Sequence, residues 1–291
     1  MLEGLPIEFT VVVAVVFGLL IGSFLNVVIY RLPVMMEREW AAELAEAQAD
    51  KTAPASTYSV VSEPERFNLF VPRSRCPHCG HQVRWYENLP VVSWLALRGR
   101  CSACKGGISL RYPLVEAFTG LLFGFCAWRW GVTTTALLWC GFSAALIALA
   151  MIDWDTTLLP DSITLPLLWA GLLGSALQWL SVPLTDAVWG AAAGYLSLWL
   201  IYWAFKLLTG KEGMGFGDFK LYAALGAWFG WQALIPLILM ASVTGAVVGI
   251  ALKLRSQLRA GAYVPFGPFL AAAGLVGLAV GPLALRQFAA L

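Results

Sequence analysis

Long apolar runs dominate the pattern of hydrophobic and polar positions along this 291-residue chain. The runs extend for about 20 residues, the length that a helix needs to cross a bilayer, and they lack the alternation of a membrane β-strand. We therefore expect an all-α polytopic membrane protein. The pattern predicts eight membrane-spanning helices: Ile7–Ile29, Tyr112–Trp130, Thr134–Ile152, Ile163–Leu180, Thr185–Phe205, Phe219–Trp231, Ala233–Leu252 and Pro265–Leu285.

The longest polar stretch, Tyr30–Arg111, separates the first predicted span from the second. It divides the chain into a first transmembrane helix (1–29), a loop region (30–111) and a seven-helix membrane domain (112–291). Within the loop, Met36–Lys51 is rich in Ala and Glu and predicts a surface helix. Thr52–Pro64 contains two prolines and several Ser and Thr residues, which is typical of a linker.

Composition and charge support a membrane protein and indicate its orientation. Charged residues make up 12% of the chain, against about 25% in a soluble domain. The loop region holds 11 of the 19 Lys and Arg residues, and two further short loops hold three each. Because cytoplasmic loops carry the excess of Lys and Arg, we expect the loop region in the cytoplasm and both termini on the opposite side. This topology accounts for the basic residues, so the net charge of +2 indicates no nucleic-acid partner.

Four of the six cysteines form two Cys-x-x-Cys pairs within the loop region, Cys76–Cys79 and Cys101–Cys104, with 21 residues between them. Such pairs supply four thiolates to a tetrahedral Zn²⁺ ion, and a filled Cys₄ site is structural because it leaves no open coordination position. Two disulfides are the alternative, but a cytoplasmic loop is in a reducing compartment, which favours zinc. His78 and His81 are at most spare ligands.

Two aspartates stand at the ends of apolar runs, where an ionised side chain is costly. Asp153 follows the run Ala144–Ile152, and Asp218 precedes the run Phe219–Gly230. In the eight-span topology both lie at the cytoplasmic face. Two carboxyls on separate helices can share one proton, which is the arrangement of an aspartic protease.

Other candidate residues near the membrane allow simpler interpretations. Asp155 lies about 200° around a helix from Asp153, so we expect it to be solvated. Asp161 stands in a good N-cap context for the fourth span. Asp218 is also a candidate cap for the sixth span, and Gly215 and Gly217 form either a simple turn or a place where the backbone of a peptide substrate approaches closely.

Three classes of function remain open on these grounds. Both histidines of the chain lie in the loop region, which excludes a Ser-His-Asp or Cys-His site in the membrane. A proton-coupled transporter would use buried aspartates, but it would place them at midplane in inverted repeats. A zinc-organised scaffold without catalysis leaves the positions of Asp153 and Asp218 unexplained. An aspartic protease accounts for both aspartates.

The chain also resembles the type IV prepilin leader peptidase/N-methyltransferase family, which consists of GxGD-type intramembrane aspartic proteases. The resemblance covers nearly the full length. It is carried by both Cys-x-x-Cys pairs and by the motifs Gly22-Ser-Phe-Leu-Asn-Val-Val-Ile-Tyr-Arg-Leu-Pro33, Ser93-Trp-Leu-Ala-Leu-Arg-Gly-Arg-Cys101, Arg111-Tyr-Pro-Leu-Val-Glu116, Ile152-Asp-Trp-Asp-Thr-Thr-Leu-Leu-Pro-Asp161, Gly213-Met-Gly-Phe-Gly-Asp-Phe-Lys220 and Pro265-Phe-Gly-Pro-Phe269.

The resemblance implies that Asp153 and Asp218 are the catalytic pair, supported by Gly215, Gly217 and Asp161. It implies cleavage of a short basic leader from prepilins and type II secretion pseudopilins at the cytoplasmic face of the bacterial inner membrane, with both termini periplasmic. It further implies N-methylation of the new N-terminal residue with S-adenosylmethionine, an activity that the family associates with the zinc-bearing loop. The pilus or type II secretion assembly machinery and membrane lipid are the other partners it implies.

Gly99 is the residue of the loop that we connect with methyl transfer. It lies two positions before Cys101, where the backbone is tightly constrained. A glycine there permits either a close approach that a side chain would block or a simple turn.

Overall fold

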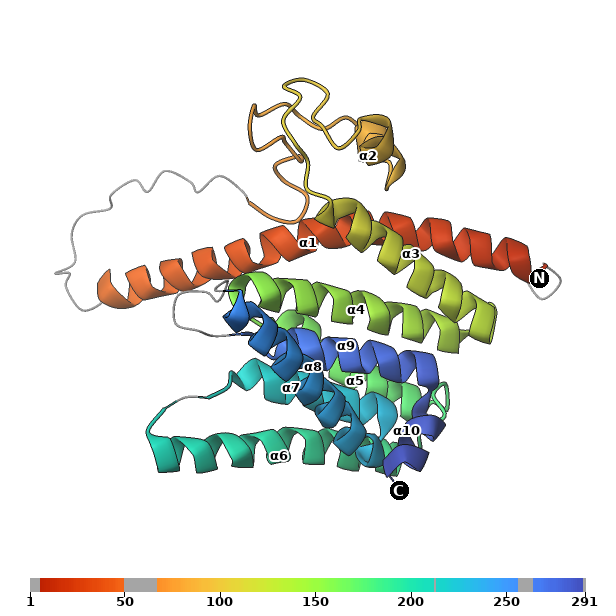
Figure 1. Cartoon of the computed structure of the whole chain (residues 1–291), viewed down its shortest axis with the longest axis vertical. Helices are drawn as coiled ribbons and strands as arrows, with labels where there is room; N and C mark the ends of the chain where they lie inside the picture. The colour runs from red at the N-terminus through yellow and green to blue at the C-terminus, as the bar shows by residue number, and fades with distance from the viewer. Residues whose placement is uncertain (1–5, 50–66, 212, 256–263, 290–291) are drawn as a thin grey trace. The chain divides into compact units, whose positions relative to one another are not determined.

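The computed structural model describes residues 6–49, 67–211, 213–255 and 264–289. These residues form helices, turns and loops without a β-strand, which confirms the all-α prediction (Figure 1). The α-helices are α1 (Ile7–Ala49), α2 (Val92–Ala96), α3 (Arg111–Trp130), α4 (Thr134–Thr156), α5 (Asp161–Ala176), α6 (Leu184–Thr209), α7 (Phe216–Phe229), α8 (Leu234–Leu254), α9 (Gly267–Val280) and α10 (Pro282–Ala289). Two 3₁₀ helices, η1 (Trp85–Asn88) and η2 (Trp231–Ala233), complete the set.

Four segments among the described residues are long and apolar enough to cross a membrane: Ile7–Gln48, Thr134–Thr156, Leu184–Thr209 and Trp231–Leu254. Helices α9 and α10 make a fifth if they are counted as one span, but they meet at an angle of 106°. The prediction of one continuous helix over Pro265–Leu285 is therefore wrong. The bend follows from Gly281, which has φ +89°, and from Pro282, which cannot continue a helix.

Helix α1 is longer than the sequence pattern predicts. It runs without a break from Ile7 to Ala49, with Pro33 inside it, so the first span and the expected surface helix are one element. Ala and Glu are strong helix formers, and they continue the helix beyond the proline. The predicted linker Thr52–Pro64 lies outside the described residues.

The chain forms two compact units, one of residues 1–18 and 119–291 and the other of residues 19–118, so α1 and α3 contribute to both. In the first unit α7 packs between α5 and α6, while α9 packs against α4, α7 and α8 (Figure 1). The predicted domain boundaries at residues 29 and 111 stay a prediction.

Helix α7 is clamped tightly within the first unit. An aromatic cluster joins it to α4: the ring of Phe142 lies 4.6 Å from that of Trp228 and 5.6 Å from that of Phe229. On the other side, Gly190 of α6 and Gly226 of α7 meet backbone to backbone, so that a Cβ atom on either would overlap the other's carbonyl. This packing holds the first turn of α7, which contains Asp218, in a defined place.

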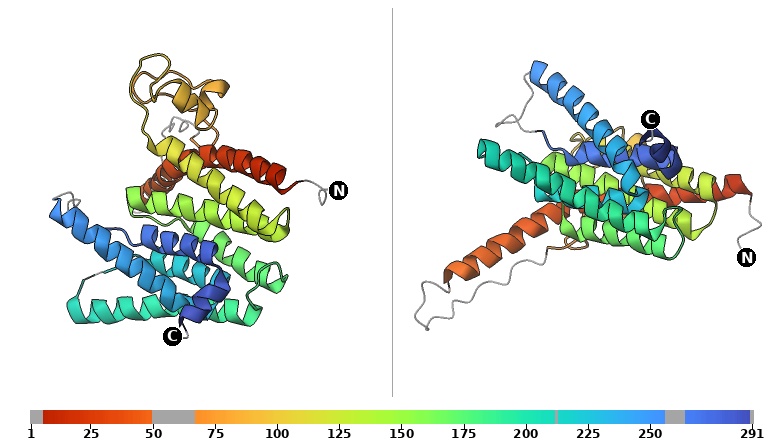
Figure 2. Two further views of the ribbon diagram at one scale, coloured as in Figure 1. Left: turned by 45° about the vertical axis from the view of Figure 1, so that its right-hand side comes forward. Right: turned by 90° about the horizontal axis from the view of Figure 1, so that it is seen from below.

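Helix α8 belongs to the same unit only through its first half. Its buried residues are Leu234, Pro236, Leu237 and Ala241. Beyond them α8 diverges from the neighbouring helices, as both views of Figure 2 show. The exposed apolar side chains of the second half, such as Val247 and Ile250, are those expected of a lipid-facing helix.

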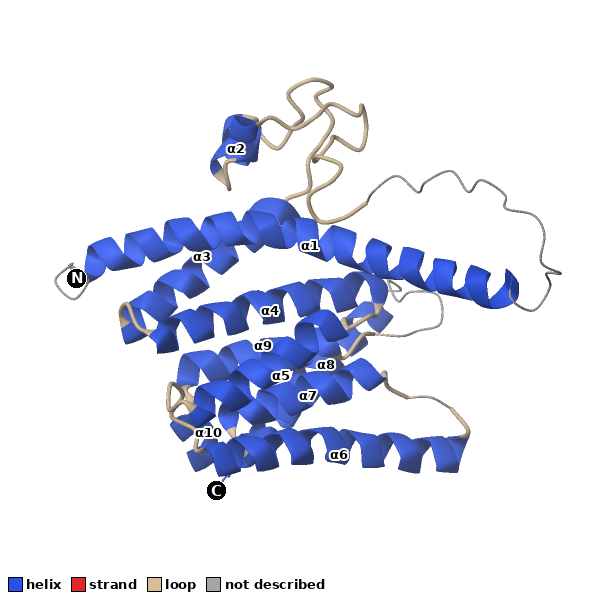
Figure 3. Ribbon diagram, turned by 180° about the vertical axis from the view of Figure 1, so that it is seen from behind, coloured by secondary structure: helices blue, strands red, loops and turns tan. Residues whose placement is uncertain are grey.

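The second unit also holds the loop between α1 and α3, and in the described part of this loop, residues 67–110, the regular elements are η1 and α2 (Figure 3). Buried polar side chains of the helices hold this loop. Arg31 of α1 donates to the carbonyl of Asn68 at 2.8 Å and to that of Pro72 at 2.5 Å. The carboxylate of Glu116 in α3 accepts from the backbone N–H of Val91 at 2.7 Å. Arg31 and Glu116 thus attach the loop to the two helices through its backbone.

Candidate active site and metal centre

The structure brings Asp153 and Asp218 together, although 65 positions separate them in the sequence. Asp153 lies in the last turn of α4 and is 5% exposed, and Asp218 lies in the first turn of α7 and is 3% exposed. The two carboxyl groups are close enough to interact electrostatically. This is the arrangement of paired, buried carboxyls that the sequence predicts.

Helix ends place the two carboxyls in different surroundings. The backbone N–H of Gly215, the N-cap of α7, donates to the Asp218 carboxyl, whose Oδ1 atom is buried with no hydrogen-bond partner in the described part of the chain. The N-terminal end of a helix favours negative charge, whereas its C-terminal end, where Asp153 stands, disfavours it. The two carboxyl groups therefore lie in different electrostatic environments.

Gly267, the first residue of α9, is a site residue that sequence reasoning missed. A Cβ atom at this position would lie 2.5 Å from Oδ2 of Asp153. The backbone of α9 can thus reach the Asp153 carboxylate only because residue 267 has no side chain. The signal in the sequence was a glycine between Phe266 and Pro268 at the start of an apolar run.

The two glycines before Asp218 have different surroundings. The Cβ position of Gly217 lies 2.6 Å from Cβ of Leu159, so Leu159 fills the space that a substrate backbone was expected to use. At Gly215 the one neighbour within 4 Å is Oδ2 of Asp218, at 3.9 Å. Close approach at Gly217 therefore serves packing, and open space remains only at Gly215.

Asp161 does not cap the fourth span as predicted. Helix α5 begins at Asp161 itself, its N-cap is Pro160, and no side chain caps it. Instead, both carboxylate oxygens of Asp161 accept from Nζ of Lys220 at 2.7 Å, which ties α5 to the first turns of α7. The N-cap prediction failed because the charge of Lys220, two residues beyond Asp218, offers a stronger partner than a backbone N–H. Asp155 is exposed, as expected.

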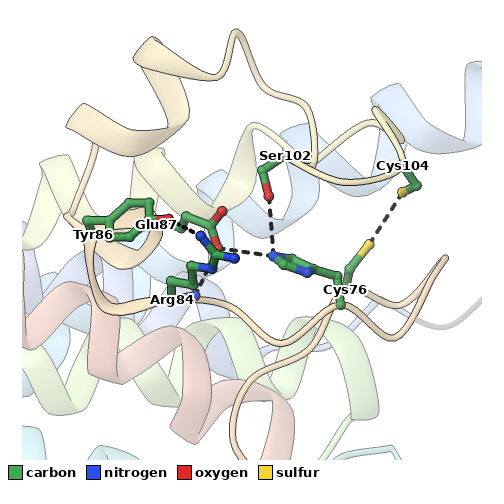
Figure 4. A network of polar contacts seen from close by, with 7 residues as sticks. Cys76, Arg84, Tyr86, Glu87, Ser102 and Cys104 are labelled. Carbon is green, nitrogen blue, oxygen red and sulfur yellow. Dashed lines mark hydrogen bonds and ion pairs between the residues drawn. The ribbon is translucent and has the colours of Figure 1, made fainter.

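The four loop cysteines form one cluster, in which all thiol sulfurs lie within 4.8 Å of one another. The Sγ atoms of Cys76 and Cys104 are 3.8 Å apart (Figure 4). Tetrahedral Zn²⁺ with Zn–S bonds of about 2.3 Å requires sulfurs about 3.8 Å apart. The donor set and its spacing therefore fit zinc.

The two Cys-x-x-Cys turns repeat one geometry. An antiparallel bridge closes each of them, Arg75 with Gln82 and Arg100 with Gly107. The residue after the second cysteine has a left-handed backbone in both, with φ +71° at Gly80 and +59° at Lys105. The backbone N–H groups of His78 and Cys79 lower the pKa of Cys76 to about 7, whereas burial and the neighbouring thiols raise the pKa of Cys79 to about 11, so Cys76 is the more readily ionised of the two.

Neither histidine of the loop belongs to the described metal cluster, which contains only cysteines. Nε2 of His81 lies 3.3 Å from both the Glu87 carboxylate and the Ser102 hydroxyl. The ring of His78 packs against Gly106. Their roles are thus in packing and hydrogen bonding.

Comparison with known proteins identifies the family of the chain. Two family models match, the bacterial peptidase A24 N-terminal domain over residues 16–130 and the type IV leader peptidase family over residues 140–250. A prepilin leader peptidase/N-methyltransferase of Stutzerimonas stutzeri is 54% identical over 94% of this chain and 91% of its own length. The chain belongs to the type IV leader peptidase family. Proteins of the same name from Aeromonas salmonicida and Pseudomonas aeruginosa are 51% and 48% identical, over 98% and 97% of this chain and 96% and 94% of their own lengths. No solved structure matches the chain.

The two family models of this leader peptidase separate its two sites. The cysteine cluster and Gly99 fall in the segment that matches the N-terminal domain, and both aspartates fall in the segment that matches the leader peptidase family. Gly99 has φ +68°, and a Cβ atom there would lie 2.8 Å from the ring of Trp94. Gly99 therefore shows both features that the sequence offered as alternatives, a turn and a close approach, and the group that approaches it is a tryptophan of α2. Its connection with methyl transfer stays a prediction.

Proposed function

We propose that this protein cleaves the short basic leader from type IV prepilins and type II secretion pseudopilins and then N-methylates the new N-terminal residue. The close relatives are named for both activities, and they match over nearly their whole length. The observation that carries the peptidase assignment is the pair of buried aspartates from the ends of α4 and α7. The assignment of Asp153 and Asp218 as catalytic residues is part of this proposal.

The chemistry of cleavage follows from two neighbouring carboxyls that share a proton. The ionised carboxylate accepts a proton from a water molecule, which attacks the scissile carbonyl, and the protonated carboxyl donates to the leaving amine. Gly267 and Gly215 bring backbone groups close to the two side chains, which supports their orientation. The packing of α7 between α5 and α6 keeps the geometry of the pair.

An eight-span topology in the bacterial inner membrane would set the depth in the bilayer at which the substrate meets the two carboxyls. In this topology α4 and α7 both present their aspartate ends to the cytoplasm, and both termini are periplasmic. A basic leader would remain at the cytoplasmic face while the apolar helix of the prepilin lies in the bilayer, which places the scissile bond at the level of the carboxyls. Pilus or type II secretion machinery would receive the product, and lipid would surround the apolar helices.

We assign a structural Zn²⁺ ion to Cys76, Cys79, Cys101 and Cys104. Four thiolates fill the tetrahedral coordination sphere, so the metal supplies cross-links that fold a loop with little core of its own. S-adenosylmethionine would supply a methyl group on a sulfonium sulfur. The methyl group would pass to the neutral N-terminal amine of the cleaved pilin, with S-adenosylhomocysteine as the second product.

Incubation of the purified full-length protein with a prepilin in detergent tests the proposal. Mass spectrometry of the product N-terminus reports cleavage and methylation together. Asp153→Asn and Asp218→Asn should each lower the cleavage rate at least a hundredfold, roughly the contribution of acid–base catalysis. Asp155→Asn is the matched control, because Asp155 is exposed and lies on the same helix turn as Asp153. Cleavage at the normal rate by either dyad variant would refute the assignment.

A further inference from the structure

A cavity of about 510 Å³ lies in the second unit, beside the cysteine cluster. Its walls come from the segment His81–Glu87, from α2 and the following Leu97, and from Ser102 and Ala103 of the second metal-binding turn. Sites for small molecules range from about 300 to 1,000 Å³. The cavity therefore has the size of a ligand site, and the peptidase mechanism makes no use of it.

Glu87 gives the cavity a fixed negative charge. Its carboxylate accepts from the backbone N–H of Arg84 at 2.8 Å and lies 3.3 Å from Nε2 of His81. The hydrogen bonds from Arg84 and Ser102 lower the pKa of Glu87 to about 2. The carboxylate is thus ionised at any physiological pH and is complementary to a cationic ligand group.

A positive charge and an aromatic ring stand on the same wall. The guanidinium of Arg84 donates to the hydroxyl of Tyr86 at 2.7 Å, and Figure 4 shows both side chains beside Glu87. Arg84 is exposed, so its other donors can bind a carboxylate. Tyr86 offers a ring face on which a flat heterocycle can stack.

The remaining walls add hydroxyl groups and apolar surface. Ser93 and Ser102 supply hydroxyl oxygens that can accept from a ribose; the Ser93 hydroxyl itself donates to the carbonyl of Leu89 at 2.8 Å, and that of Ser102 lies 3.3 Å from Nε2 of His81. Ala96, Leu97 and Ala103 supply apolar contacts. The cavity therefore combines an anion, a cation, hydroxyls and a ring, which suits a zwitterionic amino acid joined to a nucleoside.

We propose that this cavity binds S-adenosylmethionine. The inference rests on the proposed methyl transfer and identifies the residues that would hold the methyl donor: Arg84 at the amino-acid carboxylate, Glu87 at the positive charges, and Tyr86 at the adenine. The N-terminal amine of a cleaved pilin is the competing ligand. An amine followed by a short apolar side chain would use Glu87 but neither Arg84 nor most of the 510 Å³ volume.

The position of the cavity also explains why the zinc turns and Gly99 matter to it. Ser102 and Ala103 lie between two of the thiol ligands, Cys101 and Cys104, so the metal fixes that wall. Gly99 accepts from the N–H of Ile108 at 2.7 Å and donates to the carbonyl of Trp94 at 2.8 Å, which fixes the end of α2. Gly99 is thus a positioning residue, because its bonds set the place of Ala96 and Leu97.

Calorimetric titration of the full-length, zinc-loaded protein in detergent with S-adenosylhomocysteine, the product of the methyl donor, tests the site without turnover. Arg84→Ala and Tyr86→Ala should each raise its Kd at least about tenfold, the effect of losing one charge-assisted hydrogen bond or one stacking contact. Arg73→Ala is the matched control, because Arg73 is an exposed arginine of the same loop outside the cavity. Zinc content and prepilin cleavage should stay unchanged in all three variants.

The possible outcomes test the assignment of this cavity and the proposed methyl transfer separately. If the wild type binds and methylates but both cavity variants retain its Kd, the cavity is not the donor site and the proposed function stands. If the variants lose methylation while their Kd for S-adenosylhomocysteine is unchanged, the cavity binds the pilin amine and our assignment is wrong. If the wild type cleaves prepilin but neither binds S-adenosylhomocysteine nor methylates, the methyl-transfer part of the function fails and the site fails with it.

Discussion

At the scale of single residues, the site depends as much on missing side chains as on the two carboxyls. Gly267 leaves room for Asp153, Gly217 leaves room for Leu159, and Gly99 leaves room for Trp94. Each of these glycines makes room for one specific neighbouring residue and does not serve as a flexible hinge. Substitution by alanine therefore tests a single contact.

Gly267→Ala should impair cleavage selectively. Its Cβ atom would come within 2.5 Å of Oδ2 of Asp153, so the carboxylate must move from its partner. We expect the cleavage rate to fall at least tenfold, since displacement of a catalytic group by about 1 Å can cost about a hundredfold. Methylation of a peptide that is already cleaved should persist. The control is Gly141→Ala in α4, where no atom lies within 4 Å of the added carbon. Full cleavage activity in Gly267→Ala would show that α9 does not restrain Asp153.

The ion pair between Asp161 and Lys220 should contribute little to stability. Asp161 is 55% exposed and Lys220 29% exposed, and exposed pairs contribute about 0–1 kcal/mol. Asp161→Asn should therefore lower the melting temperature only slightly and preserve cleavage. Thermal unfolding in detergent and the prepilin assay measure both effects. A loss of activity comparable to that of Asp218→Asn would assign Asp161 a direct part in the reaction.

At the scale of elements, the residues of the proposed active site lie at helix ends. Asp153 ends α4, Asp218 begins α7, Gly267 begins α9 and Asp161 begins α5. Helix interiors supply the packing that keeps these ends in register. The contact between Gly190 and Gly226 is the closest of these interior contacts, because the two backbones touch.

Gly226→Ala should weaken the attachment of α7 to α6. The added methyl group overlaps the carbonyl of Gly190, and overpacking of this kind typically costs about 1–3 kcal/mol. We expect a lower melting temperature and a lower cleavage rate, because the first turn of α7 carries Asp218. Gly249→Ala in α8, with its nearest neighbour 4.0 Å away, is the matched control. Equal melting temperatures for the two variants would contradict the packing argument.

At the scale of the whole molecule, the sequence predicts the helical class, the pairing of Asp153 with Asp218 and the gathering of four cysteines, because each has a local signature. Each of these features can be recognised from neighbouring residues in the sequence: hydrophobic runs, carboxyls at the ends of such runs, and Cys-x-x-Cys spacing. The bend at Gly281, the partner of Asp161 and the approach of Gly267 depend on neighbours that are distant in sequence. The sequence pattern also did not predict that α1 continues through Pro33, because a proline usually marks a helix boundary.

Damage to the second unit should separate the two activities. Gly99→Ala forces a side chain into a position with φ +68° and against Trp94, whereas Gly107→Ala in the same loop meets no atom within 4 Å. We expect Gly99→Ala to reduce methylation at least tenfold while changing cleavage by less than about twofold, and Gly107→Ala to leave both intact. Mass spectrometry of one prepilin product measures both reactions. Equal loss of cleavage and methylation in Gly99→Ala would mean that the loop is general scaffolding.

The spacing of the cysteine sulfurs has a consequence for biogenesis. Cys76 and Cys104 lie 3.8 Å apart, and the proposed topology places them in a reducing compartment, where thiolates remain available to metal. A chain inserted upside down would expose the same thiols to oxidants, which would join them covalently and displace the ion. The loop would then lose its fold, and with it the walls of the adjoining cavity. With the proposed zinc site and topology, the cluster would therefore distinguish the two orientations of the chain, because the loop would fold only on the reducing side.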